Sequence, residues 1–368
     1  MSTNNVLASG PNHTLIIDGE SCAWLIGTNC YGQGGLPLHP DGKIKKIEDL
    51  PQVTSVSAGE NHSIFLAQDG SVWVLGSNAK GQLGTRNKKQ VEIPKQLKLS
   101  SKMILIASAD SHSLFLDDSG TAWGCGNNKS GQLGLGRFSK SIVNEPTKIS
   151  KISQIVSIHA GSRSSLFLNA EGQAFVCGYN NRGRLGLGTT DNICKPTLIP
   201  NLPPIVTAAI STHSLLLDAE GCVWGCGHNS HGQLGVSSST NWLITECTKI
   251  DNLPSIKAVA CGNTHSVFLD NEGSVWMCGL NEYGELGFSD KLDRNTTSKL
   301  EDIPPIICIS AGYRFSFFVD INFRLWPCGF NAYSQLGLPE ANTPQLIDCL
   351  PSIKSLSTPT KSANKINN

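Results

Sequence analysis

A tryptophan recurs along this chain at an almost constant interval of about 50 residues. The residues at the recurring position are Trp24, Trp73, Trp123, Phe175, Trp224, Trp276 and Trp326. The steps between them are 49, 50, 52, 49, 52 and 50 residues. A fixed period of this length indicates one structural unit copied around or along an axis. Seven copies span nearly all 368 residues, so we expect a single domain whose units bury their cores against their neighbours.

Each copy contains four short stretches with the character of β-strands. In the second copy these are residues 53–58, 63–67, 71–75 and 93–99, of which the last contains a proline that only an edge strand tolerates. Glycine-rich turns separate them, and no helical period appears. Four strands per unit and seven units predict an all-β fold, a seven-bladed β-propeller with four-stranded blades. A linear β-solenoid is the alternative.

The two ends of the chain suggest how the ring closes. Residues 350–358 repeat the opening of the second copy and then stop, whereas the first copy lacks part of its leading segment. We therefore expect strand 350–358 to join the N-terminal strands in one blade, which removes open edges. The propeller is expected over residues 1–358, followed by a flexible tail at 359–368. The repeats are expected near residues 6–35, 53–84, 104–136, 155–188, 205–235, 256–287 and 306–337.

Charge and cysteine content limit the classes of partner and the compartment. The 29 basic and 29 acidic residues balance, which argues against direct nucleic-acid binding. The N-terminus has no secretory signal, and no apolar run is long enough to span a membrane. An odd count of 13 cysteines without a signal indicates a reducing intracellular compartment, the cytosol or nucleus. One repeat position accepts cysteine, isoleucine or leucine, so we interpret its cysteines as buried apolar residues. We expect no metal and no cofactor.

Histidine and asparagine each recur at one position of the repeat. The histidines are His13, His62, His112, His213 and His265. Catalysis needs one site and not a ring of five, so we expect half-buried side chains bonded to neighbouring backbone. The asparagines are interpreted as turn formers. Nucleophile-elbow, phosphate-loop and zinc-protease motifs are absent from the sequence, so we expect no chemical turnover.

Three motifs recur in a fixed order, with variations: Gly-x-x-His-Ser-x-x-Leu, Gly-x-x-Trp-x-x-Gly-x-Asn and Gly-Gln-Leu-Gly. Over roughly residues 6–358, this order resembles the regulator of chromosome condensation repeat. The resemblance implies a seven-bladed propeller that serves as a binding platform. The founding member of the family is the exchange factor for the small GTPase Ran. Other members bind chromatin, sense UV-B light or form modules in ligases, so the fold alone does not decide the function.

The resemblance also implies one site residue. The turn Ala109–His112 matches a turn whose carboxylate, in the Ran exchange factor, helps to release nucleotide, so Asp110 is the carried-over candidate. Its role would be to compete with phosphate and Mg²⁺ contacts, and an Asx-turn former is the alternative. The next turn should supply a second acid but holds Arg163, and no copy carries an insertion that could form the family's β-wedge. The turns before the histidines hold no tryptophan, which argues against a photoreceptor.

Further partner-binding candidates lie where the copies differ. Residues 86–102 are strongly basic, whereas residues 270–302 are acidic, which predicts a dipolar ring that steers an acidic partner; solvated loops are the alternative. Trp242 stands in a polar loop, as a contact anchor or packed between blades. The candidates for partner binding are Arg86, Lys88, Lys89, Lys95, Arg163 and Trp242.

Together these observations and the resemblance predict a monomeric, intracellular interaction platform. We expect it to bind and regulate a Ran-like small GTPase, at most as an exchange factor. The alternative is a non-catalytic scaffold that docks chromatin or another regulatory protein. A bacterial protein delivered into a host cell fits the same pattern.

Overall fold

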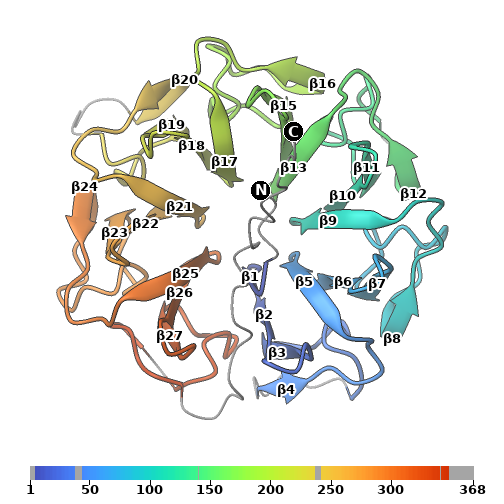
Figure 1. Cartoon of the computed structure of the whole chain (residues 1–368), viewed down its shortest axis with the longest axis horizontal. Coiled ribbons are helices and arrows are strands. Elements are labelled where there is room, and N and C mark those ends of the chain that lie inside the picture. Colours follow the sequence, from blue (N-terminus) through green and yellow to red (C-terminus); the bar gives the residue numbers. More distant parts are fainter. Residues whose placement is uncertain (1–4, 38–43, 140, 237–241, 340, 348–368) are drawn as a thin grey trace, which may run out of the picture.

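The chain forms a closed ring of seven antiparallel β-sheets in a computed structural model (Figure 1). The structure describes residues 5–37, 44–139, 141–236, 242–339 and 341–347, and this part of the chain contains strands and no helix. The prediction of a seven-bladed propeller is confirmed.

Within each blade the strands follow chain order from the central channel outward. The innermost strands are β1 (Leu7–Ser9), β5 (Val53–Ala58), β9 (Met103–Ser108), β13 (Ile155–Gly161), β17 (Ile205–Ile210), β21 (Ile256–Cys261) and β25 (Ile306–Ala311). The second strands are β2 (His13–Ile17), β6 (His62–Ala67), β10 (His112–Asp117), β14 (Ser164–Asn169), β18 (His213–Asp218), β22 (His265–Asp270) and β26 (Phe315–Asp320).

The outer half of each blade is less buried. The third strands are β3 (Ala23–Gly27), β7 (Val72–Gly76), β11 (Ala122–Gly126), β15 (Ala174–Gly178), β19 (Val223–His228), β23 (Val275–Gly279) and β27 (Leu325–Gly329). The outermost strands are β4 (Lys45–Lys46), β8 (Val91–Gln96), β12 (Val143–Lys148), β16 (Ile193–Leu198), β20 (Leu243–Lys249) and β24 (Arg294–Lys299). The second strands are buried along their whole length, whereas the outermost strands contain no fully buried residue.

The ring closes where the first blade meets the last. The described residues of blade 1 already provide four strands, and β1, of three residues, is shorter than its counterparts. Ser9 of β1 donates its backbone N–H to the hydroxyl of Ser310 on β25, at 3.1 Å. In blade 7, Ile347 bonds to Leu325 and so takes the place of an outermost strand. The expected closing strand at 350–358 lies outside the described residues.

The hydrophobic cores lie between blades and not within them. There are seven core clusters among the described residues, and each draws its side chains from two adjacent blades. Ile64 of β6, for example, packs in one cluster with Ile106 and Phe115 of the next blade. A blade therefore needs both neighbours, as the repeat length predicts.

A buried hydrogen-bond chain joins most neighbouring blades. In five blades the histidine that opens the second strand bonds through Nε2 to a serine hydroxyl on the second strand of the next blade, at 2.7 to 3.1 Å. His62, for example, bonds to Ser113, which in turn donates to the carbonyl of Gln82 in the blade of His62. Because the hydroxyl proton goes to the carbonyl, the imidazole must donate from Nε2. The histidines are fully buried, so the expectation of half-buried rings bonded to backbone is wrong in both respects.

Two of the seven contacts between blades lack this imidazole. Blade 4 has Ser164 in place of the histidine, and blade 7 has Phe315. Phe315 packs edge-to-face on Phe317, with ring centres 5.8 Å apart, in the core shared by blades 7 and 1. At blades 4 and 5 an arginine, Arg184, bridges the two blades through the carbonyls of Ser162 and Ser211.

The recurring tryptophan is held by an aspartate that the sequence analysis did not single out. In five blades the indole Nε1–H donates to an Asp carboxylate six residues earlier, at 2.7 to 3.0 Å. The same carboxylate accepts the backbone N–H groups of the hairpin between the second and third strands, as Asp117 does for Ser119 and Thr121. Where Phe175 replaces the tryptophan, Asn169 replaces the aspartate. The recurring asparagines accept a backbone N–H five residues later, which confirms them as turn formers.

Alternate strand directions place the connections on two faces of the ring. We call face A the one formed by the turns between first and second strands and the loops between third and fourth strands. The turn containing Asp110 and the recurring Gly-Gln-Leu-Gly loops both belong to face A.

The hydrogen-bond chain predicts the effect of removing one serine. Ser113→Ala deprives the buried His62 ring of its partner and Gln82 of a donor, so we expect a loss of about 1–3 kcal/mol in the free energy of unfolding. Urea denaturation measures it. The exposed Ser153 is the matched control, and Ser153→Ala should change the same quantity by less than about 0.5 kcal/mol. Equal effects of the two substitutions would contradict a structural role for the chain.

The buried imidazoles also predict acid sensitivity. Burial lowers the pKa of His62 to about 3, from an ordinary value of about 6.5. Below about pH 6.5 the unfolded chain therefore binds protons that the folded chain does not bind. The free energy of unfolding falls as the pH drops from about 6.5 toward 3. The slope per histidine is at most about 1.4 kcal/mol per pH unit. Urea titrations at several pH values should show a shallower slope for His62→Phe, which copies the residue of blade 7; an unchanged slope would refute the assignment.

Candidate interaction face

The centre of face A surrounds one mouth of the central channel. The channel has a volume of about 690 Å³ and is lined by the seven innermost strands and the turns that follow them. Small side chains such as Ser57, Ala107 and Ala208 line its wall. The turns at the mouth differ from blade to blade, so their side chains give each sector of the face its own character.

Asp110 lies half-buried at this mouth. The hydroxyl of Ser162, in the next blade, donates to its carboxylate at 3.2 Å. Burial raises the pKa of Asp110, and this rise is opposed by the Ser162 hydrogen bond and by the positive charges of Arg163 and Arg184. The structure thus places the candidate carboxylate against a serine and two cations.

A second carboxylate lies beside Asp110, but in the preceding turn. Burial and the charge of Asp110 raise the pKa of Glu60, while Arg163 lowers it. The resemblance predicted the second acid in the following turn, which holds Arg163. The sequence did not predict Glu60, because the repeat pattern does not contain which two turns approach each other in the arrangement of the blades.

Arg163 and Arg184 share one aromatic ring. Their guanidinium carbons lie 5.8 and 5.1 Å from the ring centre of Tyr179, within cation–π range. The backbone N–H of Tyr179 donates to the carbonyl of Arg163 at 2.8 Å, which holds the ring beside the turn. Arg163 itself is exposed and Arg184 is buried. Arg163 was predicted from the sequence as a partner-binding residue, whereas Arg184 was not. The signal for Arg184 is that it replaces the recurring glutamine of the Gly-Gln-Leu-Gly loop.

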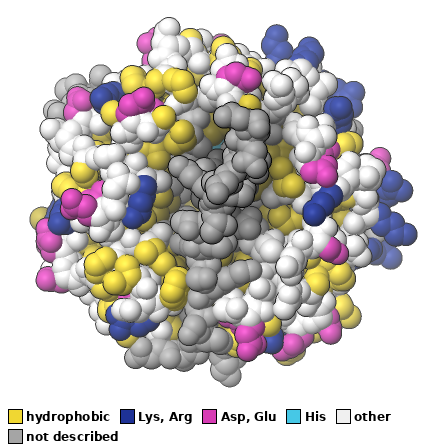
Figure 2. Space-filling model, viewed as in Figure 1, with side chains coloured by type: hydrophobic (Ala, Val, Ile, Leu, Met, Phe, Trp, Pro, Cys, Tyr) yellow, Lys and Arg dark blue, Asp and Glu magenta, His cyan; other side chains and the backbone are white. Residues whose placement is uncertain are grey.

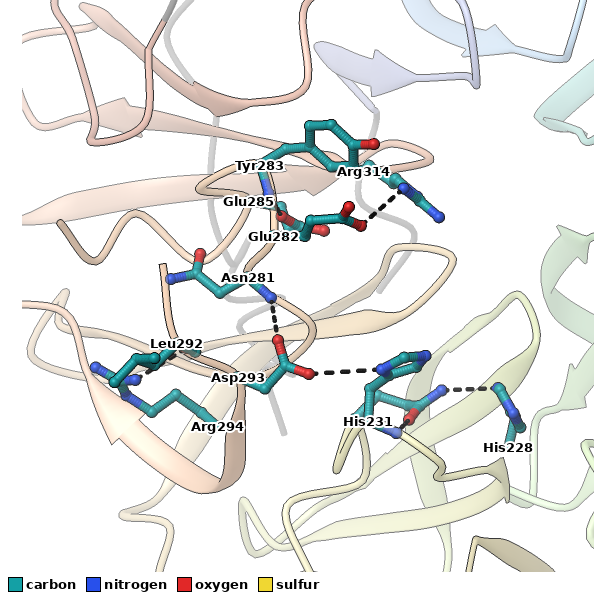
Figure 3. Close-up of polar contacts among 11 residues, drawn as sticks. His228, His231, Asn281, Glu282, Tyr283, Glu285, Leu292, Asp293, Arg294 and Arg314 are labelled. Carbon is teal, nitrogen blue, oxygen red and sulfur yellow. Dashed lines mark hydrogen bonds and ion pairs between the residues drawn. The ribbon is translucent and has the colours of Figure 1, made fainter. Parts of the chain in front are cut away.

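Blades 6 and 7 carry a related cluster with a different charge balance (Figure 3). Arg314 pairs with Glu282 at 3.3 Å and lies 5.1 Å from the ring centre of Tyr283. Here the recurring glutamine is replaced by Glu285, which is fully buried and accepts the backbone N–H of Tyr283. Burial raises the pKa of Glu285 to about 7. Figure 3 also shows His231 directed toward Asp293, at 3.5 Å.

The basic candidates lie along the outer edge of blade 2. Arg86 pairs with Glu145 of blade 3 at 3.0 Å, and Lys88, Lys89 and Lys95 are exposed. Figure 2 shows Lys and Arg side chains gathered along the edge near β8 and β12. The acidic stretch belongs to blade 6, across the ring in Figure 1. The structure therefore separates the two charged regions as expected.

Two lysines of this edge border a shallow apolar groove. The groove has a volume of about 450 Å³, and its lining includes Lys89, Lys95, Leu36 and Ile93. Leu36 and Ile93 are exposed large apolar residues.

Trp242 is exposed and precedes β20. Its side chain is 66% exposed, so the alternative of packing between blades is wrong. Its backbone carbonyl accepts the N–H of Asn229 and so ties it to the loop of face A. Its role in partner binding stays a prediction.

The described cysteines are free thiols, and those at the recurring position are buried. Each of these five places its sulfur 3.3 to 3.7 Å from a backbone carbonyl of the preceding blade, as Cys125 does with Gln82. Burial raises the pKa of Cys125 far above that of a reactive thiol. Within the described residues, no group of three His, Cys, Asp or Glu side chains is placed to hold a metal ion. The same part of the chain contains no helix of the length and apolar character that a membrane crossing requires.

These features define a repeat-built propeller whose variable face is suited to contact with other molecules. Comparison with known families identifies the family of the repeat. The regulator of chromosome condensation (RCC1) repeat matches residues 69–116, 119–168, 171–217, 220–269 and 272–319. A second description of the same repeat matches residues 53–82, 104–132 and 256–285. The chain therefore belongs to the RCC1 repeat family.

Individual relatives agree with this membership. The human E3 ubiquitin-protein ligase HERC2 is 29% identical over 171 residues, which is 44% of this chain but 4% of the ligase. The mouse RCC1-like G exchanging factor-like protein is 29% identical over 144 residues, 38% of this chain and 31% of that protein. The chain thus matches less than a third of either relative.

Solved structures share the fold. Human WBSCR16 superposes with a TM-score of 0.80 at 20% identity, covering 89% of this chain and 94% of that one. Prp20p from Saccharomyces cerevisiae, reported with its binding properties to Gsp1p and histones, gives a TM-score of 0.77 at 24% identity, covering 93% and 87%. At these identities the likeness concerns the fold alone.

The buried carboxyl of blade 6 predicts a second pH effect. The pKa of Glu285 is about 7 in the folded chain and near its ordinary, lower value in the unfolded one. Its contribution to stability is therefore present at acid pH and is lost as the pH rises through 7. Glu285→Gln introduces the residue that five other loops carry at this position, so we expect it to raise the free energy of unfolding at pH 8 by about 1–3 kcal/mol. The gain should shrink at pH 5 in urea titrations; a gain independent of pH would contradict the argument.

Proposed function

We propose that this protein binds a Ran-like small GTPase through face A and regulates its nucleotide state. The observation that carries the proposal is a pair of carboxylates in neighbouring turns of face A: Asp110, which lines the mouth of the channel, and the exposed Glu60 of the preceding turn. Asp110 stands in the turn that the family resemblance assigns to nucleotide release, and Glu60 is near enough for the charge of Asp110 to raise its pKa, which supports the proposal. Membership of the RCC1 repeat family and the likeness to an exchange factor-like protein support this proposal.

The electrostatics of the pair suit the task. Burial raises the pKa of both carboxyl groups, because the low-dielectric surroundings disfavour their charged forms. A partner that brings Mg²⁺ or a phosphate-binding lysine to the mouth would favour ionisation, since an ion pair is stronger away from bulk water. Such a contact withdraws the cation from the nucleotide and weakens nucleotide binding. The protein itself makes and breaks no covalent bond in this scheme.

A second function is favoured by one residue. Arg163, exposed beside both carboxylates, opposes the approach of a cation from the partner. This charge suits a scaffold that docks a regulatory protein, or chromatin, without accelerating nucleotide release. The two functions differ in a measurable rate.

Two assays with Ran test the proposal and separate its two forms. Immobilised protein is incubated with nucleotide-free and nucleotide-loaded Ran, and release of a fluorescent GDP from Ran is then followed. We expect binding and faster release. Binding without faster release would establish the scaffold, and failure to bind in any nucleotide state would refute the GTPase assignment.

Asp110→Ala tests the site within the same assay. We expect the release rate to fall by about tenfold, which corresponds to about 1.4 kcal/mol of lost transition-state stabilisation. Glu272→Ala, an exposed acid in a hairpin on the opposite face, is the matched control and should leave the rate unchanged. Equal rates for Asp110→Ala and the unmodified protein would exclude Asp110 from the mechanism.

A further inference from the structure

Three guanidinium groups gather in blade 4 on face A. Arg163 comes from the turn between the first two strands, and Arg182 and Arg184 come from the loop that follows β15. Arg163 and Arg184 lie over the ring of Tyr179, and Arg182 reaches the ring of His228 at 3.3 Å. Two turns of one blade thus bring three positive charges together, two of them over one tyrosine.

Arg184 is the buried member of the group. Its side chain is 3% exposed, one of its terminal nitrogens donates to the carbonyls of Ser162 and Ser211, and its Nε has no partner among the described residues. Burial lowers the pKa of Arg184 to about 10, and the charges of Arg182 and Arg163 add to this lowering. Like charges held this closely repel one another, and an anion between them removes the repulsion.

The described neighbours compensate this charge only in part. Asp110 lies on the side of the channel, where the Ser162 hydroxyl donates to it and the charges of Arg163 and Arg184 oppose the rise that burial causes in its pKa. His228 adds no negative charge: burial lowers its pKa to about 4, so its ring is neutral, and its Nδ1 accepts within hydrogen-bond distance of Arg182 and Gln233. Arg182 and Arg163 are exposed to solvent.

Blades 6 and 7 hold a comparable arginine, in a contact between two blades, that is paired with a carboxylate. Arg314 occupies the turn position of Arg163, and Glu285 occupies the loop position of Arg184. Arg314 contacts the tyrosine ring of its cluster and pairs with Glu282, while Glu285 lies nearby (Figure 3). The arginine of blade 7 therefore has a carboxylate in an ion pair, whereas among the described residues no carboxylate forms an ion pair with Arg163, Arg182 or Arg184.

We infer that Arg163, Arg182 and Arg184, with Tyr179, form a binding site for a phosphate monoester. Guanidinium groups bind phosphate oxygens through paired, charge-assisted hydrogen bonds, and clusters of arginine are the usual receptors for phosphorylated side chains. A dianion matches the excess of charge better than a single carboxylate does. The phosphate reaches the site on a phosphorylated side chain of a partner or on a nucleotide, and the site does not depend on the identity of the GTPase.

Calorimetric titration of the full chain tests the site. The probes are a Gly-Gly-phosphoserine-Gly-Gly peptide, the same peptide without phosphate, GDP and inorganic phosphate. We expect saturable binding of phosphate-bearing probes and none of the unphosphorylated peptide. Tightest binding of the peptide would identify a phosphorylated partner as the source, and tightest binding of GDP would identify a nucleotide. No saturable binding of any phosphate probe at millimolar concentration would overturn the inference.

Substitutions locate the binding. Arg163→Gln and Arg182→Gln, both at exposed positions, should each weaken binding of the best probe by about tenfold. Arg184→Gln introduces the residue found in five other blades, and it should weaken binding likewise while its circular dichroism spectrum stays that of the unmodified protein. Arg314→Gln is the matched control and should leave the affinity unchanged. Unchanged affinity in the blade 4 variants, or an equal loss in Arg314→Gln, would overturn the assignment.

Discussion

The bond from a buried histidine of one blade to a serine of the next is the interaction on which the ring depends. A blade cannot bury its apolar side chains alone, so every core is shared by two blades, and hydrophobic contact does not by itself set their register. The imidazole, the hydroxyl and the loop carbonyl satisfy one another only at one relative position of the blades. This requirement explains why His62, Ser113 and the carbonyl of Gln82 recur together and why the histidines are unavailable for catalysis.

The same framework explains where function can reside. The recurring residues are buried and occupied with holding blades together, so chemistry is left to positions where a copy departs from the pattern. Arg184 in blade 4 and Glu285 in blade 6 stand at the position of the recurring glutamine. They place opposite charges at equivalent positions, so the two blades favour partner groups of opposite charge. Face A is consequently uneven, with carboxylates at its centre, cations over blade 4 and lysines along the edge of blade 2.

The sequence was sufficient for the fold and for part of the site. Trp73, Asn78 and their counterparts recur in phase, and a period of about 50 residues with four strand-like stretches leaves few other folds. The aspartate that holds each tryptophan also recurs, and comparison of the copies could have revealed it. The approach of Glu60 to Asp110 could not be predicted, because it depends on the distance between neighbouring blades, which a repeat pattern does not contain. The exposure of Trp242 could not be predicted either, because this loop residue has no counterpart in the other repeats from which its burial could be inferred.

The two blade contacts without an imidazole divide the ring into unequal classes. Blades 4 and 5 are joined by an arginine, and blades 7 and 1 by an apolar core around the edge-to-face pair Phe315 and Phe317, so neither contact contains the recurring buried histidine that acid destabilises in the other five. Protonation of the recurring histidines would therefore act on five of the seven contacts between blades. The contact between blades 7 and 1 is not one of the five, and it holds together the beginning and the end of the described chain.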